Sequence, residues 1–309
     1  MTGVDSVLAR ARLREVSPEG FLRIAAASVL SLYVIIFTGA LVRLTGSGLA
    51  CESWPGCESG AFFPAVGDHS TIEFGNRVFA LFPLVLTLVA WLAARRSAGL
   101  PRWVRWVTAL TFLGTLAQAP LGLLTITLDL HPLMVMTHFL LALLVLAGAV
   151  VVAVEALGNA RGRVPSPVPP WLRGVGVVLV VSCGVLVVTG ALSTAAGPHP
   201  GDSAEIDRFW NLLDAVYVHV RATAVFGIGF LVLLVYLVHH RARVGLLLPV
   251  ALGLLALLLV QMAVGEIQYR NQLPWWLVLI HVVLAAGVWA WTVGLAAALW
   301  LTPAWPTRA

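Results

Sequence analysis

The chain has 309 residues, of which 60% are hydrophobic and only 11% are charged. Soluble proteins average about 25% charged residues, so this chain has too few polar side chains to cover a soluble surface, and its composition excludes a soluble enzyme. The net charge of +5 comes from arginines that lie between apolar runs. This placement indicates charges that orient a membrane protein rather than a surface that binds nucleic acid.

Eight charge-free runs are long enough to cross a lipid bilayer. A hydrocarbon core of about 30 Å needs roughly 20 apolar residues in a helix. The sequence therefore predicts an all-α integral membrane protein with eight transmembrane helices. In chain order, the runs lie between Arg23 and Arg43, Arg77 and Arg95, Arg105 and Asp129, Asp129 and Glu155, Arg173 and Asp202, Arg221 and Arg241, Arg243 and Glu266, and Arg270 and Arg308.

The arginines are distributed unevenly between the two sides of these spans. If the N-terminus is inside, 14 of the 19 arginines fall on inner segments, which predicts cytoplasmic termini in the plasma membrane. The chain then divides into a four-helix half over residues 1–157, a cytoplasmic linker over 158–172 and a second four-helix half over 173–309. The inner arginines are Arg10, Arg12, Arg14, Arg23, Arg95, Arg96, Arg102, Arg105, Arg161, Arg163, Arg173, Arg241, Arg243 and Arg308.

The two halves resemble each other. The tripeptide TGA at residues 38–40 recurs at residues 189–191. Because each half has an even number of spans, the repeats run parallel, and they predict two four-helix bundles related by a pseudo-twofold axis along the membrane normal. Three further matches share one constant offset along the chain: Gln118 with Gln261, Gly122 with Gly265, and His138 with His281.

His219 and His281 lie on the second and fourth helices of the second half. Two histidines on facing helices of a four-helix bundle are typical of a haem iron site, so we predict that these two are iron ligands. A single histidine inside a membrane is more often hydrogen-bonded to a neighbouring helix, and no Cys, Asp or Glu joins the pair at the spacing of zinc sites. The offset that relates His138 to His281 places Asn76 at the position of His219.

Two arginines lie close to these positions. Arg77 follows Asn76, and Arg221 comes two residues after His219. Arginine binds carboxylates in a bidentate manner, which would suit the two propionates of haem. An arginine that extends to the membrane interface explains each residue equally well.

The first outer loop carries Cys51 and Cys57, and the next helix carries Glu73. The outer compartment permits a disulfide, which would either staple the loop or exchange electrons with the site. Glu73 shares a helix face with Asn76, three residues later. We predict that its carboxylate faces whatever His138 holds; the alternative is a carboxylate that only stabilises the start of its helix.

Three segments are distinctive: residues 39–49 (GALVRLTGSGL), Cys51 with Trp54, Pro55 and Cys57, and residues 72–77 (IEFGNR). Together they resemble the heme A synthase family. The resemblance covers nearly the whole chain, and the first run followed by the cysteine pair is its most specific part.

The resemblance implies an oxidoreductase that converts the C8 methyl of heme O into a formyl group by successive hydroxylations, giving heme A. It implies that the second half holds haem b through His219 and His281. The first half would take heme O, with His138 as an iron ligand and Glu73 as the catalytic acid. The implied partners are heme O synthase (a farnesyltransferase), terminal oxidase assembly and an electron acceptor, for which a quinone is one candidate.

The chain departs from the family at one position. The family commonly has Glu-x-x-His-Arg where this chain has EFGNR at residues 73–77. Asparagine is a poor iron ligand, so we expect the haem of the first half to be five-coordinate through His138 or to have water on the Asn76 side. The departure also leaves open that the first half no longer catalyses.

Two other functions are compatible with parts of the sequence. A quinone-linked electron-transfer protein with a bis-histidine haem b would share the second half, but it would not need Glu73 near His138. A parallel-repeat transporter is less favoured, because the polar residues cluster at outer helix ends and no span is expected to be broken at the midplane.

Overall fold

The computed structural model describes residues 15–65, 67–163, 166–202 and 207–301; Arg10, Arg12, Arg14 and Arg308 of the predicted orientation lie outside them. Eight helical stretches are long and apolar enough to cross a membrane, so the prediction of an all-α chain with eight such helices is confirmed. The helices are α2 (Pro18–Leu44), α3 (Asp68–Phe79), α4 (Leu81–Ala94), α5 (Arg102–Thr127), α6 (Pro132–Arg161), α7 (Pro170–Ala196), α8 (Leu212–His239), α9 (Leu247–Arg270) and α10 (Trp275–Leu301).

Helices α3 and α4 together make the second span, with an interruption at Ala80. Pro83 has no N–H to donate to the carbonyl of Phe79, and its ring crowds that carbonyl. Ala80 keeps helical dihedrals, and its N–H bonds to the Asn76 carbonyl while its own carbonyl accepts from Leu84, so the span is locally irregular at this point but continuous. Because α3 begins at Asp68, Glu73 lies in its second turn rather than at its start.

Several helices continue past the charges that were expected to end them. Helix α6 includes Glu155 and ends at Arg161, beyond the predicted boundary at residue 157. Glu155 is fully buried and forms an ion pair with Arg163, so its charge does not stop the helix. Helix α7 begins at Pro170, inside the predicted linker.

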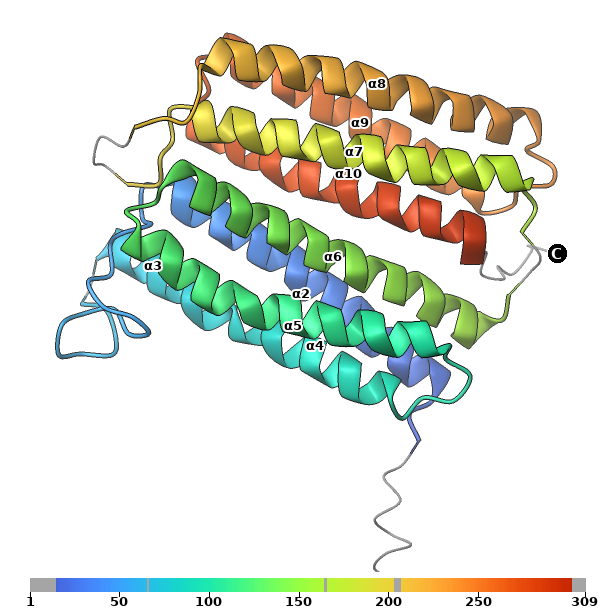
Figure 1. Cartoon of the computed structure of the whole chain (residues 1–309), viewed down its shortest axis with the longest axis horizontal. Helices are drawn as coiled ribbons and strands as arrows, with labels where there is room; N and C mark the ends of the chain where they lie inside the picture. The colour runs from blue at the N-terminus through green and yellow to red at the C-terminus, as the bar shows by residue number, and fades with distance from the viewer. Residues whose placement is uncertain (1–14, 66, 164–165, 203–206, 302–309) are drawn as a thin grey trace, which may run out of the picture.

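The helices contact one another in two closed sets. In the first set, α2 contacts α4 and α6, and α5 contacts the same two helices. In the second set, α7 contacts α8 and α10, and α9 contacts the same two. Figure 1 shows α7–α10 side by side above α2–α6, and α10 touches both α2 and α6 at the junction.

Three side chains join the two sets across this junction. The Tyr33 hydroxyl donates to the carbonyl of Val283 at 2.8 Å, and the Trp289 indole donates to the carbonyl of Leu143 at 2.8 Å. Near the C-terminal ends of α2 and α7, Arg43 donates to the carbonyl of Thr194 at 2.9 Å. The junction is therefore bonded along much of its length as well as packed.

The outward faces of the helices carry large apolar side chains. On α8, Val225, Ile228 and Val235 are 64%, 66% and 67% exposed. A row of this kind would aggregate in water but fits the hydrocarbon of a bilayer.

Two turns at equivalent places in the two halves have the same backbone geometry. Asp129 and Leu130, between α5 and α6, have φ angles of 50° and 56°. Gln272 and Leu273, between α9 and α10, have 63° and 58°. Non-glycine residues rarely adopt this left-handed conformation, so two consecutive ones at both equivalent places are a structural repeat that sets the start of α6 and of α10.

Candidate functional site

His219 of α8 and His281 of α10 face each other in the second half. Their ring centres are 6.4 Å apart and the ring planes are inclined by 77°. A metal–nitrogen bond of about 2 Å, plus about 1.1 Å from the nitrogen to the ring centre, separates two imidazole centres across one iron by about 6 Å. The pair therefore has the separation that a bis-histidine iron site requires.

Glycines on neighbouring helices give these two rings their space. A Cβ atom built on Gly190 of α7 would lie 3.0 Å from Cε1 of His219. One built on Gly265 of α9 would lie 3.0 Å from Cε1 of His281. Each ring thus packs directly against a helix backbone, which fixes its position.

Hydrogen bonds orient the same rings. The Thr189 hydroxyl lies 3.2 Å from Nδ1 of His219, which leaves Nε2 of that ring for a metal. The amide nitrogen of Gln261 lies 3.1 Å from Nε2 of His281, and it also donates to the carbonyl of His281. Nδ1 of His281 is buried, and no residue that the structure describes bonds to it.

The first half repeats this arrangement around His138 of α6. The Gln118 amide donates to the His138 carbonyl at 3.3 Å, and a Cβ on Gly122 of α5 would lie 3.5 Å from its Cε1. Nδ1 of His138 is buried and has no hydrogen-bond partner among the described residues. A buried polar atom without a partner is unusual in a native protein, so this ring is not explained as a histidine held only by hydrogen bonds to neighbouring helices.

Asn76 of α3 holds the position equivalent to His219. Its Oδ1 accepts a hydrogen bond from the Thr38 hydroxyl at 2.7 Å, as His219 contacts the equivalent Thr189. The glycine of this repeat unit is Gly39, and a Cβ built there would meet nothing within 4 Å. The space that a histidine ring fills in the second half is therefore open in the first.

These residues fit haem better than a bare metal ion. Within the described part of the chain, no three His, Cys, Asp or Glu side chains lie close enough to hold an ion. Haem brings four nitrogen ligands of its own and needs only one or two from the protein. One imidazole pair and one single imidazole match that requirement.

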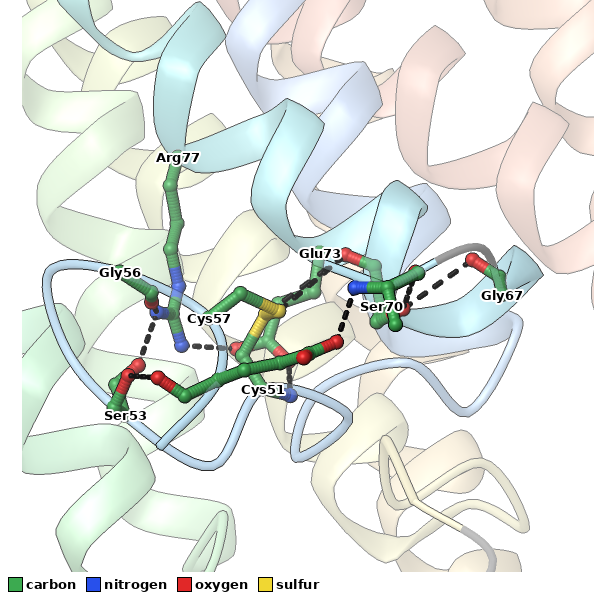
Figure 2. The surroundings of a disulfide bond; sticks show 10 residues. Cys51, Ser53, Gly56, Cys57, Gly67, Ser70, Glu73 and Arg77 are labelled. Carbon is green, nitrogen blue, oxygen red and sulfur yellow. Dashed lines mark hydrogen bonds and ion pairs between the residues drawn. A yellow bond between two sulfur atoms is a disulfide. The ribbon is translucent and has the colours of Figure 1, made fainter. Parts of the chain in front are cut away.

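Glu73 is buried beneath the first outer loop (Figure 2). Its Oε2 accepts from the backbone N–H of Cys51 at 2.8 Å, and its Oε1 pairs with Arg77 at 2.5 Å. Arg77 also donates to the carbonyls of Ser53 and Gly56. In this structure both side chains therefore hold the loop, and no contact among the described residues brings Glu73 to His138.

The structure joins Cys51 and Cys57 by a disulfide in this loop. Cys57 is fully buried and Cys51 nearly so. Phe74 of α3 packs with them, and Phe62 and Phe63 lie edge-on to the Phe74 ring. The disulfide is thus buried against the Phe74 ring at the start of α3.

Arg221 points along its own helix. Its guanidinium lies 3.0 Å from the centre of the Tyr217 ring and donates to the Tyr217 carbonyl at 3.3 Å. The residue is exposed. The predicted binding of haem propionates by Arg77 and Arg221 stays a prediction.

Sequence reasoning used Thr38, Gly39, Gln118 and their counterparts only as evidence of a repeat. The structure places all of them around the histidine positions. The repeat itself could have identified them as site residues. Residues that recur at the same offset as the histidines and lie on adjacent helices are candidates for the same site.

The chain matches the family COX15-CtaA, described as cytochrome oxidase assembly protein, over residues 67–293. Curated relatives named heme A synthase match shorter stretches. That of Bacillus pumilus (strain SAFR-032) is 28% identical over 137 residues, which is 43% of this chain and 43% of the relative.

Two further heme A synthases match shorter stretches at slightly higher identity. That of Macrococcus caseolyticus (strain JCSC5402) is 32% identical over 110 residues, covering 35% of this chain and 36% of the relative. That of Symbiobacterium thermophilum is 33% identical over 103 residues, covering 32% and 33%. The chain thus spans less than half the length of these curated relatives.

Proposed function

Because the chain belongs to the COX15-CtaA family of cytochrome oxidase assembly proteins, we propose that it is a heme A synthase. It would oxidise the C8 methyl of heme O to a formyl group and supply heme A for terminal oxidase assembly. The observation that carries the proposal is the His219–His281 pair, with ring centres 6.4 Å apart, together with His138 at the equivalent place in the first half.

The proposed architecture is a pair of four-helix bundles related by a pseudo-twofold axis. The matching helix contacts of the two sets support it, as do the equivalent turns at Asp129–Leu130 and Gln272–Leu273. The excess of arginines on one side supports cytoplasmic termini and a place in the plasma membrane.

We propose that His219 and His281 hold haem b. Bis-histidine haem supplies one-electron transfer when bound. The chain's own contribution is geometric: Thr189 bonds to Nδ1 of His219, Gln261 donates to the His281 carbonyl, and Gly190 and Gly265 let the rings sit against the helix backbones. In this structure the Gln261 amide also donates to Nε2 of His281, a bond that iron would replace. Fixed ligands of this kind favour electron transfer, because no reorganisation of the site is needed.

The first half would take heme O as its substrate, with His138 as the protein ligand to the substrate iron. Converting the methyl to a formyl group consumes one water molecule and releases four electrons and four protons. Two successive hydroxylations give a geminal diol, which loses water to form the aldehyde. The four electrons and four protons reduce two molecules of a two-electron acceptor, one for each hydroxylation, and a membrane quinone is the class we propose.

Glu73 is the proposed acid–base group. It is the buried carboxylate of the outer end of the first half, and it lies on the helix that carries Asn76. A carboxylate there would accept a proton or stabilise the positive charge that develops as electrons leave. Its bonds to Arg77 and to the Cys51 N–H orient the carboxylate and link it to the disulfide loop.

The remaining roles concern partners and the outer loop. Heme O synthase would deliver the substrate, and the assembling terminal oxidase would receive the product.

Burial of Cys51 and Cys57 against the Phe74 side chain supports a disulfide that staples the loop, while exchange of electrons with the site remains the alternative role of the pair.

The test is extraction of pigment from the full-length protein, purified from cells that also make heme O. Chromatography is expected to show haem b together with heme O or heme A, and heme A should accumulate in the membranes. Haem b alone, with no heme A formed, would overturn the proposal.

Asn76 favours one second candidate, a bis-histidine haem b protein that only transfers electrons. In that case the first half would be a structural partner without a substrate, since one of its two ligand positions lacks an imidazole. The same extraction distinguishes the two, because this candidate predicts haem b as the only pigment.

A further inference from the structure

The two halves differ at one iron-ligand position, and the difference leaves space behind. His219 fills the volume next to Gly190, with its Cε1 3.0 Å from a Cβ built there. At the equivalent Gly39, the same construction meets no atom within 4 Å. The first half therefore keeps the glycine that accommodates an imidazole ring, but no imidazole ring occupies the space beside it.

Asn76 is too short to take the place of the ring. Its amide group lies closer to the backbone than the Nε2 atom by which histidine reaches a metal. Thr38 holds its oxygen at 2.7 Å, so the NH₂ group is the part of the amide left to donate. A small molecule in the open space would thus meet a hydrogen-bond donor.

His138 supplies the opposite side of the site. It corresponds to His281 in the repeat, and Gln118 and Gly122 place it as Gln261 and Gly265 place His281. Its buried Nδ1 has no bonding partner in the described ranges. The position across from it in the repeat is that of Asn76.

We propose that the first half is a pocket for a small neutral ligand, of the size of water or a diatomic molecule, on the haem face opposite His138. Gly39 provides the space and the Asn76 amide donates a hydrogen bond to the ligand. The inference rests on the proposed function, since it requires a haem held by His138. The two halves would then differ chemically. In the second half the protein would fill both axial positions of the haem iron, and in the first half one axial position would stay open for a ligand.

Carbon monoxide is a suitable probe, because it binds reduced five-coordinate haem and binds poorly where two histidines hold the iron. The experiment uses full-length protein that carries haem in both halves. We expect about one equivalent of carbon monoxide per chain in the optical difference spectrum. The Asn76→His variant should lose this binding and gain a second low-spin haem signal.

The reciprocal variant is the matched control. His219→Asn makes the second half resemble the first, and it should raise the stoichiometry to about two equivalents per chain. Gly39→Leu should fill the pocket and weaken carbon monoxide binding at least about tenfold. Gly227→Leu, at another glycine with open space around a built Cβ on α8, should leave binding unchanged.

The outcomes separate this inference from the proposed function. Two low-spin haems per chain with no carbon monoxide binding, in protein that still forms heme A, would overturn the pocket and leave the synthase. If the unmodified protein neither forms heme A nor holds haem in its first half, the pocket and the proposed function would both be overturned. Equal binding by wild type and Asn76→His would also refute the pocket, because the carbon monoxide site would then not lie next to residue 76.

Discussion

The two halves of the molecule have matching helix contacts, yet they present different side chains at equivalent helix positions. The second half has an imidazole on each of two facing helices, with ring centres 6.4 Å apart. The first half has His138 on one side and Asn76 with open space on the other. It also carries the disulfide loop and Glu73.

This comparison shows how one helical frame can serve two purposes. The glycines, threonines and glutamines that place the rings are common to both halves, so the frame itself does not decide the function. The difference in function would come from one side chain, His219 in the second half or Asn76 in the first, and from the disulfide loop. Variants that move either half toward the other test that conclusion.

The largest effect is expected from His281→Ala. It removes one of the two proposed axial ligands, so the low-spin haem b signal of the second half should be lost, as optical and electron paramagnetic resonance spectra of the purified protein would show. His239→Ala, which removes an exposed histidine from the inner end of α8, should leave the signal intact. An unchanged low-spin signal in His281→Ala would remove this residue from the ligand set.

Glu73→Gln should have the next largest effect. Loss of a general base typically lowers a rate by about 10²–10⁴-fold, so heme A formed in membranes should fall steeply while bound haem is retained. Glu266→Gln is the matched control, because Glu266 pairs with Arg270 at the same spacing on the exposed surface of α9. Normal heme A output from Glu73→Gln would contradict its assigned role.

Removal of the disulfide should have a moderate effect that is confined to the first half. Cys51 and Cys57 lie close together in the chain, and closing so short a loop contributes about 2 kcal/mol. In the Cys51→Ser/Cys57→Ser double variant, hydrogen exchange of residues 51–65 should accelerate while the haem b spectrum is unchanged. If heme A output falls with loop protection intact, the pair exchanges electrons instead of stapling the loop.

The smallest effects are expected from alanine at the two equivalent glycines, and they should have opposite signs. Gly190→Ala forces His219 to shift by a few tenths of an ångström, which should destabilise the protein by about 1 kcal/mol. Gly39→Ala meets no neighbour and should stabilise it by about 0.5 kcal/mol through helix propensity. Thermal unfolding in detergent measures both, and equal shifts would show that the space at Gly39 is not open.

The spans and the histidine positions were predictable because each follows from a simple constraint. Bilayer thickness fixes the length of an apolar helix, and the repeat offset pairs His138 with His281 without any knowledge of contacts. The helix ends were less predictable. Helix α6 continues past Glu155 because Arg163 neutralises that carboxylate. Arg163 lies beyond the end of the helix, and a hydropathy pattern does not show such a partner.

The surroundings of the charged site residues could not be derived from spacing. Glu73 and Asn76 share a helix face, yet Glu73 bonds to Cys51, which is 22 residues away in the chain. Arg221 turns to Tyr217 on its own helix. Such choices depend on loop conformation and rotamers, which a helical period does not specify.

The paired left-handed residues between α5 and α6, and between α9 and α10, have a consequence for biogenesis. Each turn closes a helical hairpin in which the histidine is already bonded to the glutamine of the partner helix, only 20 residues away in sequence. A hairpin of this kind can enter the bilayer as one unit, with its histidine already fixed by the partner helix. Each half is then completed by lateral docking of its other two spans.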